Sequence, residues 1–310
     1  MDIKHRALNM NCIKCRIPID NSSSAVYGLH PACFTEWFSV PSYAKFVSLQ
    51  RRSSTTSAST PSFTPQNISF YHGKFKKYSA DLNGDSYILK MRQKDAPELP
   101  EVEYLCNQIG KLLGVPIAEF YYIDFNDDRT FVTKNFIKSG TPTDLQHIYH
   151  FRSDEQHSCE GIIRTVAEKT QSPHDVAICI KTILFDALIG NHDRHGRNLA
   201  FIITAKNCSL SPIYDNVSYL SLESGNMLNA DFNPTGKIIT NKTNEPSMRD
   251  YVIELTRLGY RDDIQGFHQH CKLLQLFQLI DNSYCSSLMK NAIKTLLNKR
   301  FEELENELAT

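Results

Sequence analysis

One stretch, Leu184 to Asn198, constrains the fold of this chain most, because an apolar segment runs without a break into a short polar loop. The loop holds Asp193 and, five positions later, Asn198, and a second acid, Asp215, follows another short apolar run. Residues 199–204 and 211–215 are expected to form a short hairpin that brings Asp215 opposite Asn198. In kinase-type phosphotransferases such an ordered set lets the first carboxylate orient the substrate hydroxyl, while the other two side chains hold magnesium on the nucleotide phosphates. We therefore expect Asp193 to act as base or orienting group, and Asn198 and Asp215 to bind Mg²⁺ through oxygen.

The same loop resembles a known family. Residues 190–201, Gly-Asn-His-Asp-Arg-His-Gly-Arg-Asn-Leu-Ala-Phe, are similar to the catalytic loop of HipA-like serine/threonine kinases, roughly Gly-Asn-x-Asp-x-His-x-x-Asn-aromatic. Ile213-Tyr214-Asp215-Asn216 resembles their metal-binding Tyr-Asp segment. The resemblance implies a two-lobed, protein-kinase-like α/β (α+β) fold with a sheet-rich N-lobe and a helical C-lobe. Within the loop, we expect Arg194 and His195 to hold it in place or to contact the transferring phosphate.

A hairpin upstream is predicted to form the phosphate-binding part of the first lobe. Asn83-Gly84 lies between two strand-like runs, which is a strong hairpin signal. Lys90, near the end of the second run, is the candidate phosphate-pairing lysine, and the alternative is an exposed strand lysine. Glu103, in the first turn of the following helix, resembles a family glutamate that pairs with this lysine; alternatively it compensates the helix dipole. Phe136 falls where a kinase chain passes between lobes, beside the nucleotide.

The segment before the hairpin departs from the family pattern. HipA-like kinases have roughly Ser-x-Ser-Gly-x-Gln-x-Lys there, which closes over the phosphates and carries a serine whose autophosphorylation switches the kinase off. The matching run, 67–74, keeps Ser69 and Lys74, which we assign to the nucleotide site. Phe70 stands in place of the glycine, and phenylalanine resists the positive φ that glycine allows. The candidate phosphorylated serines are Ser53, Ser54, Ser57 and Ser69.

A cysteine-rich motif opens the chain. Cys12-x-x-Cys15 and His30-x-x-Cys33 put four soft ligands in two close pairs, a set that could close a tetrahedral zinc site. The alternative is a vestigial knuckle whose thiols pack as small apolar groups.

Four regions are expected along the chain. A segment rich in serine, threonine and proline, with little to bury, separates the cysteine motif from the kinase-like part. The expected boundaries are 1–49 for an N-terminal Cys/His knuckle and helix, 50–66 for a mobile segment, 67–138 for the N-lobe and 139–310 for the C-lobe.

Composition narrows the cellular setting. The chain has 34 basic and 34 acidic residues, so its formal net charge is zero. This balance does not show the excess of positive charge that direct nucleic-acid binding favours. Nine cysteines at scattered spacings, with no apolar run after Met1, predict reduced thiols and a cytoplasmic protein. The most apolar helix, 176–189, is too short to span a bilayer.

The residues and the resemblance together predict an ATP- and Mg²⁺-dependent serine/threonine protein kinase that also phosphorylates itself. The resemblance further implies a bacterial toxin–antitoxin toxin of the short HipT type, with antitoxin partners of HipB/HipS type and an aminoacyl-tRNA synthetase as substrate. Two alternatives stay open: a kinase of small molecules or lipids, and a non-catalytic nucleotide-binding module.

Overall fold

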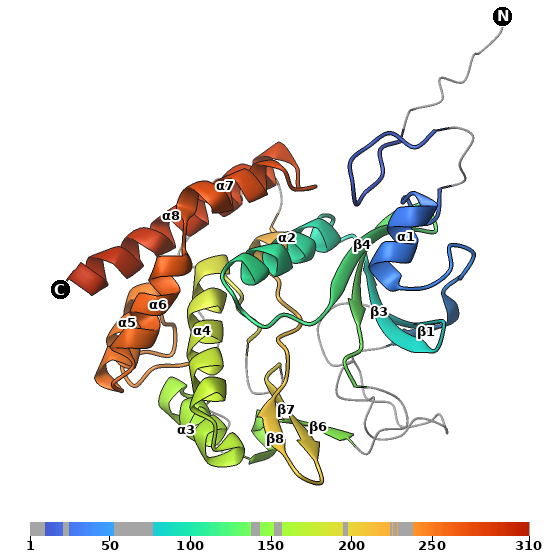
Figure 1. The fold of residues 1–310 in the computed structure, drawn as a ribbon. Helices are drawn as coiled ribbons and strands as arrows, with labels where there is room; N and C mark the ends of the chain where they lie inside the picture. The colour runs from blue at the N-terminus through green and yellow to red at the C-terminus, as the bar shows by residue number, and fades with distance from the viewer. Residues whose placement is uncertain are drawn as a thin grey trace, which may run out of the picture.

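The protein has a sheet-rich part followed by a helical part that carries a small second sheet (Figure 1). The computed structural model describes residues 10–20, 25–52, 77–137, 143–151, 157–194, 198–223, 225, 228 and 238–309. The predicted α/β class, with strands first and helices second, is confirmed. Among these residues, no helix combines the length and the apolar character that crossing a membrane requires.

In the described part of the chain, five antiparallel strands form the main sheet, in the order β1-β2-β3-β5-β4. Asn83 and Gly84 both have positive φ, 51° and 89°, which is the backbone of a type I′ turn, so the predicted hairpin is confirmed. This two-residue turn fixes the register of β2 on β3. The strands are Val47–Arg52 (β1), Lys77–Leu82 (β2), Asp85–Met91 (β3), Phe120–Phe125 (β4) and Asp128–Lys134 (β5).

Two helices cover opposite faces of this sheet. Side chains alternate between faces along a strand, so Tyr87 and Leu89 of β3 point one way and Lys90 the other. The helix α1 (Pro31–Phe38) packs on the first face, where the rings of Phe38 and Tyr87 lie 5.8 Å apart. The helix α2 (Leu99–Leu112) lies on the second face and brings Glu103 to Lys90.

The predicted linker begins inside the sheet. Residues 50–52 of the expected mobile segment 50–66 belong to β1, where Gln50 pairs with Ser79 and Arg52 with Lys77. Backbone pairing needs no apolar side chain, which is why a polar composition did not reveal this strand end. The rest of that segment lies outside the described residues.

The helical part surrounds one long buried helix, α4 (Pro173–Ile189). Ser172 caps its first turn, and Gly190 ends it at a φ of 69°. The other helices are α3 (Cys159–Thr170), α5 (Met248–Arg257), α6 (Arg261–His270), α7 (Leu273–Asp281) and α8 (Ser287–Ala309), with short 3-10 turns at Ile148–Phe151 and Tyr219–Leu222. The second sheet joins β6 (Thr143–His147), β7 (Ala200–Thr204) and β8 (Cys208–Leu210).

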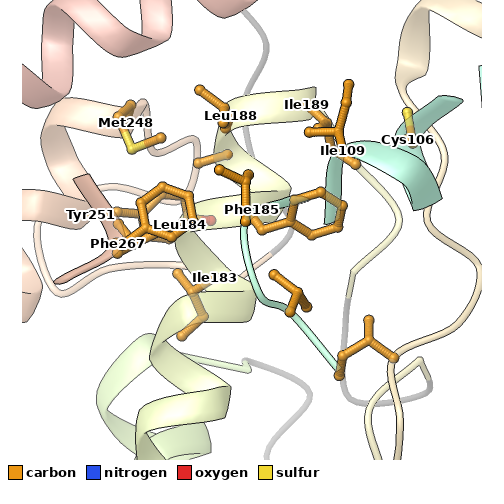
Figure 2. Packing of buried hydrophobic residues seen from close by; sticks show 14 of the residues in the cluster. Cys106, Ile109, Ile183, Leu184, Phe185, Leu188, Ile189, Met248, Tyr251 and Phe267 are labelled. Atoms are coloured by element: carbon orange, nitrogen blue, oxygen red, sulfur yellow. The ribbon is translucent and has the colours of Figure 1, made fainter. Parts of the chain in front are cut away.

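A single apolar core fastens α4 to both parts of the molecule. Figure 2 shows Phe185 of α4 beside Ile109 of α2, with Leu184 turned toward Tyr251 and Phe267 of α5 and α6. A helix buried on nearly all sides has little freedom to shift. The loop that follows α4 therefore starts from a rigid support.

The segment before Asp215 differs from the sequence prediction. A hairpin of 199–204 with 211–215 was expected, but β7 pairs instead with Cys208–Leu210. Pro212 has no N–H to give to a strand ladder, which limits pairing at that point. Ile213 instead bridges Ile117: its N–H donates to the Pro116 carbonyl at 2.8 Å, and its own carbonyl accepts from the Ala118 N–H at 2.9 Å. This bridge joins the Asp215 segment to the sheet-rich part.

Candidate active site

Lys90 and Glu103 meet in the interior, as expected from the sequence. Lys90 is 2% exposed on β3, and Glu103, on the first turns of α2, is fully buried. Their side chains form an ion pair, and the Lys90 Nζ also donates to Asp215 Oδ1 at 2.8 Å. The alternatives of an exposed strand lysine and of a glutamate serving only the helix dipole do not fit this burial.

A second buried lysine, Lys77, joins the cluster and was missed by the sequence analysis. It is the first residue of β2, is 2% exposed, and donates to Asp215 Oδ2 at 2.7 Å. It lies one residue beyond the Tyr78–Leu89 pair and therefore beside Lys90. The signal was present: a two-residue Asn-Gly turn pairs Leu82 with Asp85, and counting back along both strands places the two lysines side by side.

Asp215 is the centre of this cluster, and its neighbours control its ionisation. Burial opposes the charged carboxylate, but attraction and hydrogen bonds from Lys77 and Lys90 outweigh it and lower the pKa of Asp215. Burial would also lower the pKa of Lys90, but Asp215 and Glu103 overcome it and raise that pKa. The pKa of Lys77 is lowered, first by burial and then by repulsion from Lys90. Burial raises the pKa of Glu103, and the attraction of Lys90 opposes that shift.

The polar loop after α4 is held by its own side chains. Gly190 adopts φ 69°, and a Cβ there would come 2.9 Å from the Tyr219 ring. Asn191 donates to Asp186 Oδ1 at 2.9 Å and accepts from the Asp193 N–H at 3.1 Å. The loop therefore leaves the helix in one direction, with Asp193 exposed at its outer side.

Arg194 is the centre of the loop's attachment and is only 1% exposed. Its Nε and Nη2 donate to the two Asp186 oxygens at 2.7 and 3.2 Å, in the forked geometry that a guanidinium suits. Its Nη1 donates to the carbonyls of Asn198 and Tyr214, at 2.9 and 2.8 Å. Of the two expected roles, this burial and these contacts fit holding the loop, and they leave no donor directed at a phosphate.

The buried Asn198 contacts the exposed Asp193 within the loop. The Asn198 Nδ2 donates to the Asp193 carbonyl at 2.6 Å and approaches Asp193 Oδ2 at 3.4 Å. Because nitrogen makes these bonds, the carboxamide oxygen is the atom that Asn198 can offer to a cation. The Arg194 bridge to Tyr214 keeps this residue near Asp215. His195, Ser69 and Lys74, which were also predicted here, lie outside the described residues.

Phe136 lies just after β5 and lines a pocket of about 540 Å³ with Gly84–Ser86, Glu119 and Lys134–Ile137. Lys77, Lys90, Glu103 and Asp215 are not among the residues that line this pocket. A small apolar cluster links the two places, since Ile88 lies two residues from Lys90 and Tyr214 precedes Asp215. Its buried members come from both parts of the protein: Ile88, Ala118, Ile137, Leu145, Ala200 and Tyr214.

The N-terminal motif forms a separate group that could bind a metal. One ligand atom each from Cys12, Cys15, His30 and Cys33 lies within 4.8 Å of the others. The two motifs that are separate in the sequence, Cys12-x-x-Cys15 and His30-x-x-Cys33, thus lie together in the structure.

Comparison with known proteins identifies the family. Residues 66–294 match the family model described as the HipA-like C-terminal domain. Over 161 residues the chain is 26% identical to the "Putative kinase Y4dM" of Sinorhizobium fredii, a match that covers 45% of this chain and 39% of that protein. The chain thus spans about two fifths of this curated relative's length.

Two solved structures share the fold. The Helicobacter pylori proinflammatory kinase CtkA aligns with a TM-score of 0.63 at 17% identity, covering 76% of this chain and 91% of that one. HipA of Shewanella oneidensis, solved in a toxin–antitoxin complex with HipB and its operator DNA, aligns with a TM-score of 0.52 at 16% identity, covering 72% and 58%. The kinase-like fold is therefore established, and since the family model spans most of the chain, this protein belongs to the HipA-like C-terminal domain family.

Proposed function

We propose that this protein is an ATP-dependent kinase that phosphorylates serine or threonine on a protein. The observation that carries the proposal is the cluster of three buried side chains, Lys77, Lys90 and Glu103, around the half-buried Asp215, next to the loop that carries Asp193 and Asn198. Buried charges are costly unless they serve one another or a ligand, and perturbed groups of this kind gather at functional sites.

The donor set fits magnesium and a nucleotide. Asp215 and Asn198 would offer the oxygen ligands that Mg²⁺ prefers. Lys77 and Lys90 would pair with phosphate oxygens, with Glu103 fixing the direction of Lys90. The bound nucleotide would supply the phosphoryl group that is transferred. The pocket beside Phe136 and the cluster around Ile88 and Tyr214 would receive the base.

Asp193 is the group that we assign to the substrate hydroxyl. Its side chain is exposed at the edge of the loop, while its N–H and carbonyl are held by Asn191 and Asn198. A carboxylate held in this way can orient the hydroxyl and accept its proton. Arg194, which contacts Asp186 and two backbone carbonyls, would act by positioning the loop.

Labelling of the purified full chain tests this proposal. The chain would be incubated with Mg²⁺, γ-labelled ATP and a cell lysate, with Asp215→Asn as the inactive control. Label on a protein, recovered as phosphoserine or phosphothreonine, supports the proposal. Label confined to lipids or small molecules would refute a protein substrate. Nucleotide-dependent stabilisation without any transfer would indicate a non-catalytic module instead.

Family membership supports a narrower biological proposal. The similar HipA structure contains HipB and operator DNA. We infer that this protein acts as a toxin, held by antitoxin partners of HipB or HipS type as in the short HipT toxins, with an aminoacyl-tRNA synthetase as substrate. It would phosphorylate itself on Ser53, Ser54, Ser57 or Ser69, all outside the described residues. Intact mass after expression, compared with the Asp193→Ala chain, tests the self-modification.

The cysteine–histidine group would take zinc as a structural ion. Three thiolates and one imidazole form a common tetrahedral zinc set. A site closed by four protein ligands keeps no position for a substrate, so this ion would take no part in phosphoryl transfer.

A further inference from the structure

The geometry around His30 is suited to metal binding beyond the proximity of the four ligands. The His30 Nδ1 lies 3.4 Å from Cys15 Sγ and 4.0 Å from Cys33 Sγ. The other ring nitrogen, Nε2, lies 3.1 Å from the Pro18 carbonyl oxygen. A carbonyl only accepts, so Nε2 carries the hydrogen and the Nδ1 lone pair faces the sulfurs. The His30 N–H also donates to Cys12 Sγ at 3.4 Å.

Cys33 lies on α1, and the loops that carry the other three ligands contain little regular structure. Within residues 10–20 and 25–30 the strand pairing consists of two isolated bridges, Asn11–Pro18 and Val26–Leu29. All nine cysteines lie in the described part of the chain, and none forms a disulfide. Bound zinc would therefore join the two loops to each other and to α1, in addition to the apolar contacts that Ile13 and Leu29 make with the core.

These loops, which we call the knuckle (residues 10–20 and 25–30), rest on the edge of the main sheet. The Tyr27 carbonyl accepts from the N–H of Asp124 on β4 at 2.9 Å, and the Tyr27 ring stacks on Phe125 at 5.8 Å. Gly28 approaches so closely that a Cβ would lie 2.6 Å from Asp124 Oδ2. The knuckle is therefore fitted to the sheet-rich part.

The same knuckle also reaches the helical part, at the turn between α7 and α8. Arg16 donates from Nη2 to the Asn282 carbonyl at 2.8 Å, and its guanidinium lies 3.6 Å from the centre of the Tyr284 ring. The Tyr284 hydroxyl donates to the Ile13 carbonyl. Arg16 has a φ of 64°, a strained value for a non-glycine residue that the turn through Cys12 and Cys15 imposes. The contact of Arg16 with Asn282 and Tyr284 in the helical part thus depends on the shape of the turn from Cys12 to Cys15.

The contact between Arg16 and Tyr284 lies beside α2, the helix that carries Glu103. The Tyr284 ring lies 4.9 Å from Tyr122 of β4 and 6.3 Å from Tyr104 of α2. Just after it, Ser286 is bound through its N–H and its hydroxyl to the carboxylate of Glu98, the residue before α2, at 2.7 Å each. The α7–α8 turn therefore contacts the knuckle, the sheet and the start of α2 together.

We propose that the zinc-closed knuckle is a clasp that fastens the sheet-rich part to the helical part at the α7–α8 turn. The bridge at Ile213 joins the two parts by way of residues 116–118, and the knuckle joins them at the start of α2. Loss of the metal would relax the Cys12–Cys15 turn, withdraw Arg16 from Tyr284 and loosen the turn at residues 282–286. The clasp itself does not depend on the proposed kinase activity. Only an effect of the clasp on phosphoryl transfer would rest on that proposed activity.

Metal content and backbone exchange test the clasp without an activity measurement. The full chain, purified without chelator, should contain about one zinc per molecule. Cys15→Ser should lose most of it, while Cys208→Ser, a half-buried cysteine on β8, should keep it. A zinc content near zero in the wild type would overturn the site.

Hydrogen–deuterium exchange then separates metal binding from the clasp. Arg16→Ala keeps all four ligands, so it should retain zinc yet exchange faster at residues 282–286, whereas Arg164→Ala on α3 should match the wild type. Removing zinc from the wild type with a chelator should speed exchange at the same residues, which covers the case in which Cys15→Ser does not fold. Unchanged exchange at 282–286 in both the Arg16→Ala and the zinc-depleted protein would refute the clasp.

Discussion

Lys77 and Lys90 lie side by side on adjacent strands and donate to the two oxygens of one carboxylate, that of Asp215. One lysine is the first residue of β2 and the other the penultimate residue of β3, so the hairpin register alone brings them together. The pKa of Lys90 is raised and that of Asp215 is lowered, so the ion pair between Lys90 and Asp215 is charged at neutral pH.

Replacing either lysine should impair phosphoryl transfer. Lys77→Met and Lys90→Met each remove a positive charge that would face the phosphates, and losses of about 10²- to 10³-fold in kcat/KM are expected for such groups. Lys94→Met, an exposed lysine close in sequence, is the matched control and should remain active. Steady-state kinetics with labelled ATP measures the effect. A Lys77→Met chain of normal activity would exclude this lysine from the site.

Asp193→Ala should separate catalysis from nucleotide binding. The side chain is exposed, so its removal should leave the melting temperature near that of the wild type. Removal of a general base costs about 10²- to 10⁴-fold in rate. Nucleotide affinity, measured by calorimetry, should stay close to normal because Lys77, Lys90 and Asp215 are retained. Near-normal transfer by this chain would reject the assignment.

Arg194→Lys should weaken both stability and transfer. Lysine cannot reproduce the fork that binds Asp186 while also reaching the carbonyls of Asn198 and Tyr214. Disturbing a buried ion pair costs about 3 kcal/mol or more in the free energy of unfolding. Urea unfolding measures this cost, and Arg164→Lys on the surface of α3 is the control. An equal stability for the two variants would contradict the structural role.

Lowering the pH should reduce the free energy of unfolding of the wild type more than that of Asp215→Asn. Burial opposes ionisation of Asp215, but the two lysines outweigh it and hold its pKa below the ordinary value of about 4. A group with a depressed folded pKa adds stability that is complete above the unfolded pKa and is lost as pH falls through the folded one. The difference in unfolding free energy should be constant above about pH 5 and shrink below about pH 4. Urea titrations across this range decide, and a difference that grows in acid would refute the charge arrangement.

Gly190→Ala should cost more stability than Gly259→Ala. Both glycines have positive φ, 69° and 90°, so each substitution carries about 1 kcal/mol of backbone strain. At Gly190 the new Cβ would also meet the Tyr219 ring at 2.9 Å, whereas nothing lies within 4 Å at Gly259. The additional packing strain should be about 1–3 kcal/mol. Equal costs in denaturant unfolding would show that Tyr219 moves aside freely.

Short-range signals in the sequence predicted much of this structure. The Asn83-Gly84 turn and the apolar helix ending at Gly190 could be inferred from local patterns, whereas the Lys90–Glu103 pair was implied by the family resemblance. The helices α3 and α5 were not identified, since their polar faces weaken the apolar pattern. The strand at Cys208–Leu210 was also missed, because three residues give too short a pattern to recognise.

Two of the missed site residues, Asp186 and Asn216, depended on distant partners. Asp186 sits within an apolar helix, and its role becomes apparent only when Arg194 folds back onto it. Asn216 accepts from Arg194 and donates to Asn107 of α2 at 3.0 Å, a link across the two parts that no local spacing encodes. Lys77 could have been found by extending the hairpin register, but it was obscured by the other lysines just before it in sequence.

The double use of one Arg194 nitrogen has a mechanical consequence. Because the same Nη1 holds the carbonyls of Asn198 and Tyr214, the loop that carries Asp193 is tied to the segment that ends in Asp215. Lys77 and Lys90 belong to the main sheet, and the Ile213 bridge joins the Asp215 segment to the same sheet-rich part. Asp215 is therefore held from two sides, by the Arg194 bonds toward the loop and by the Ile213 bridge toward the sheet, so a shift of the two parts against each other would strain both sets of bonds at once.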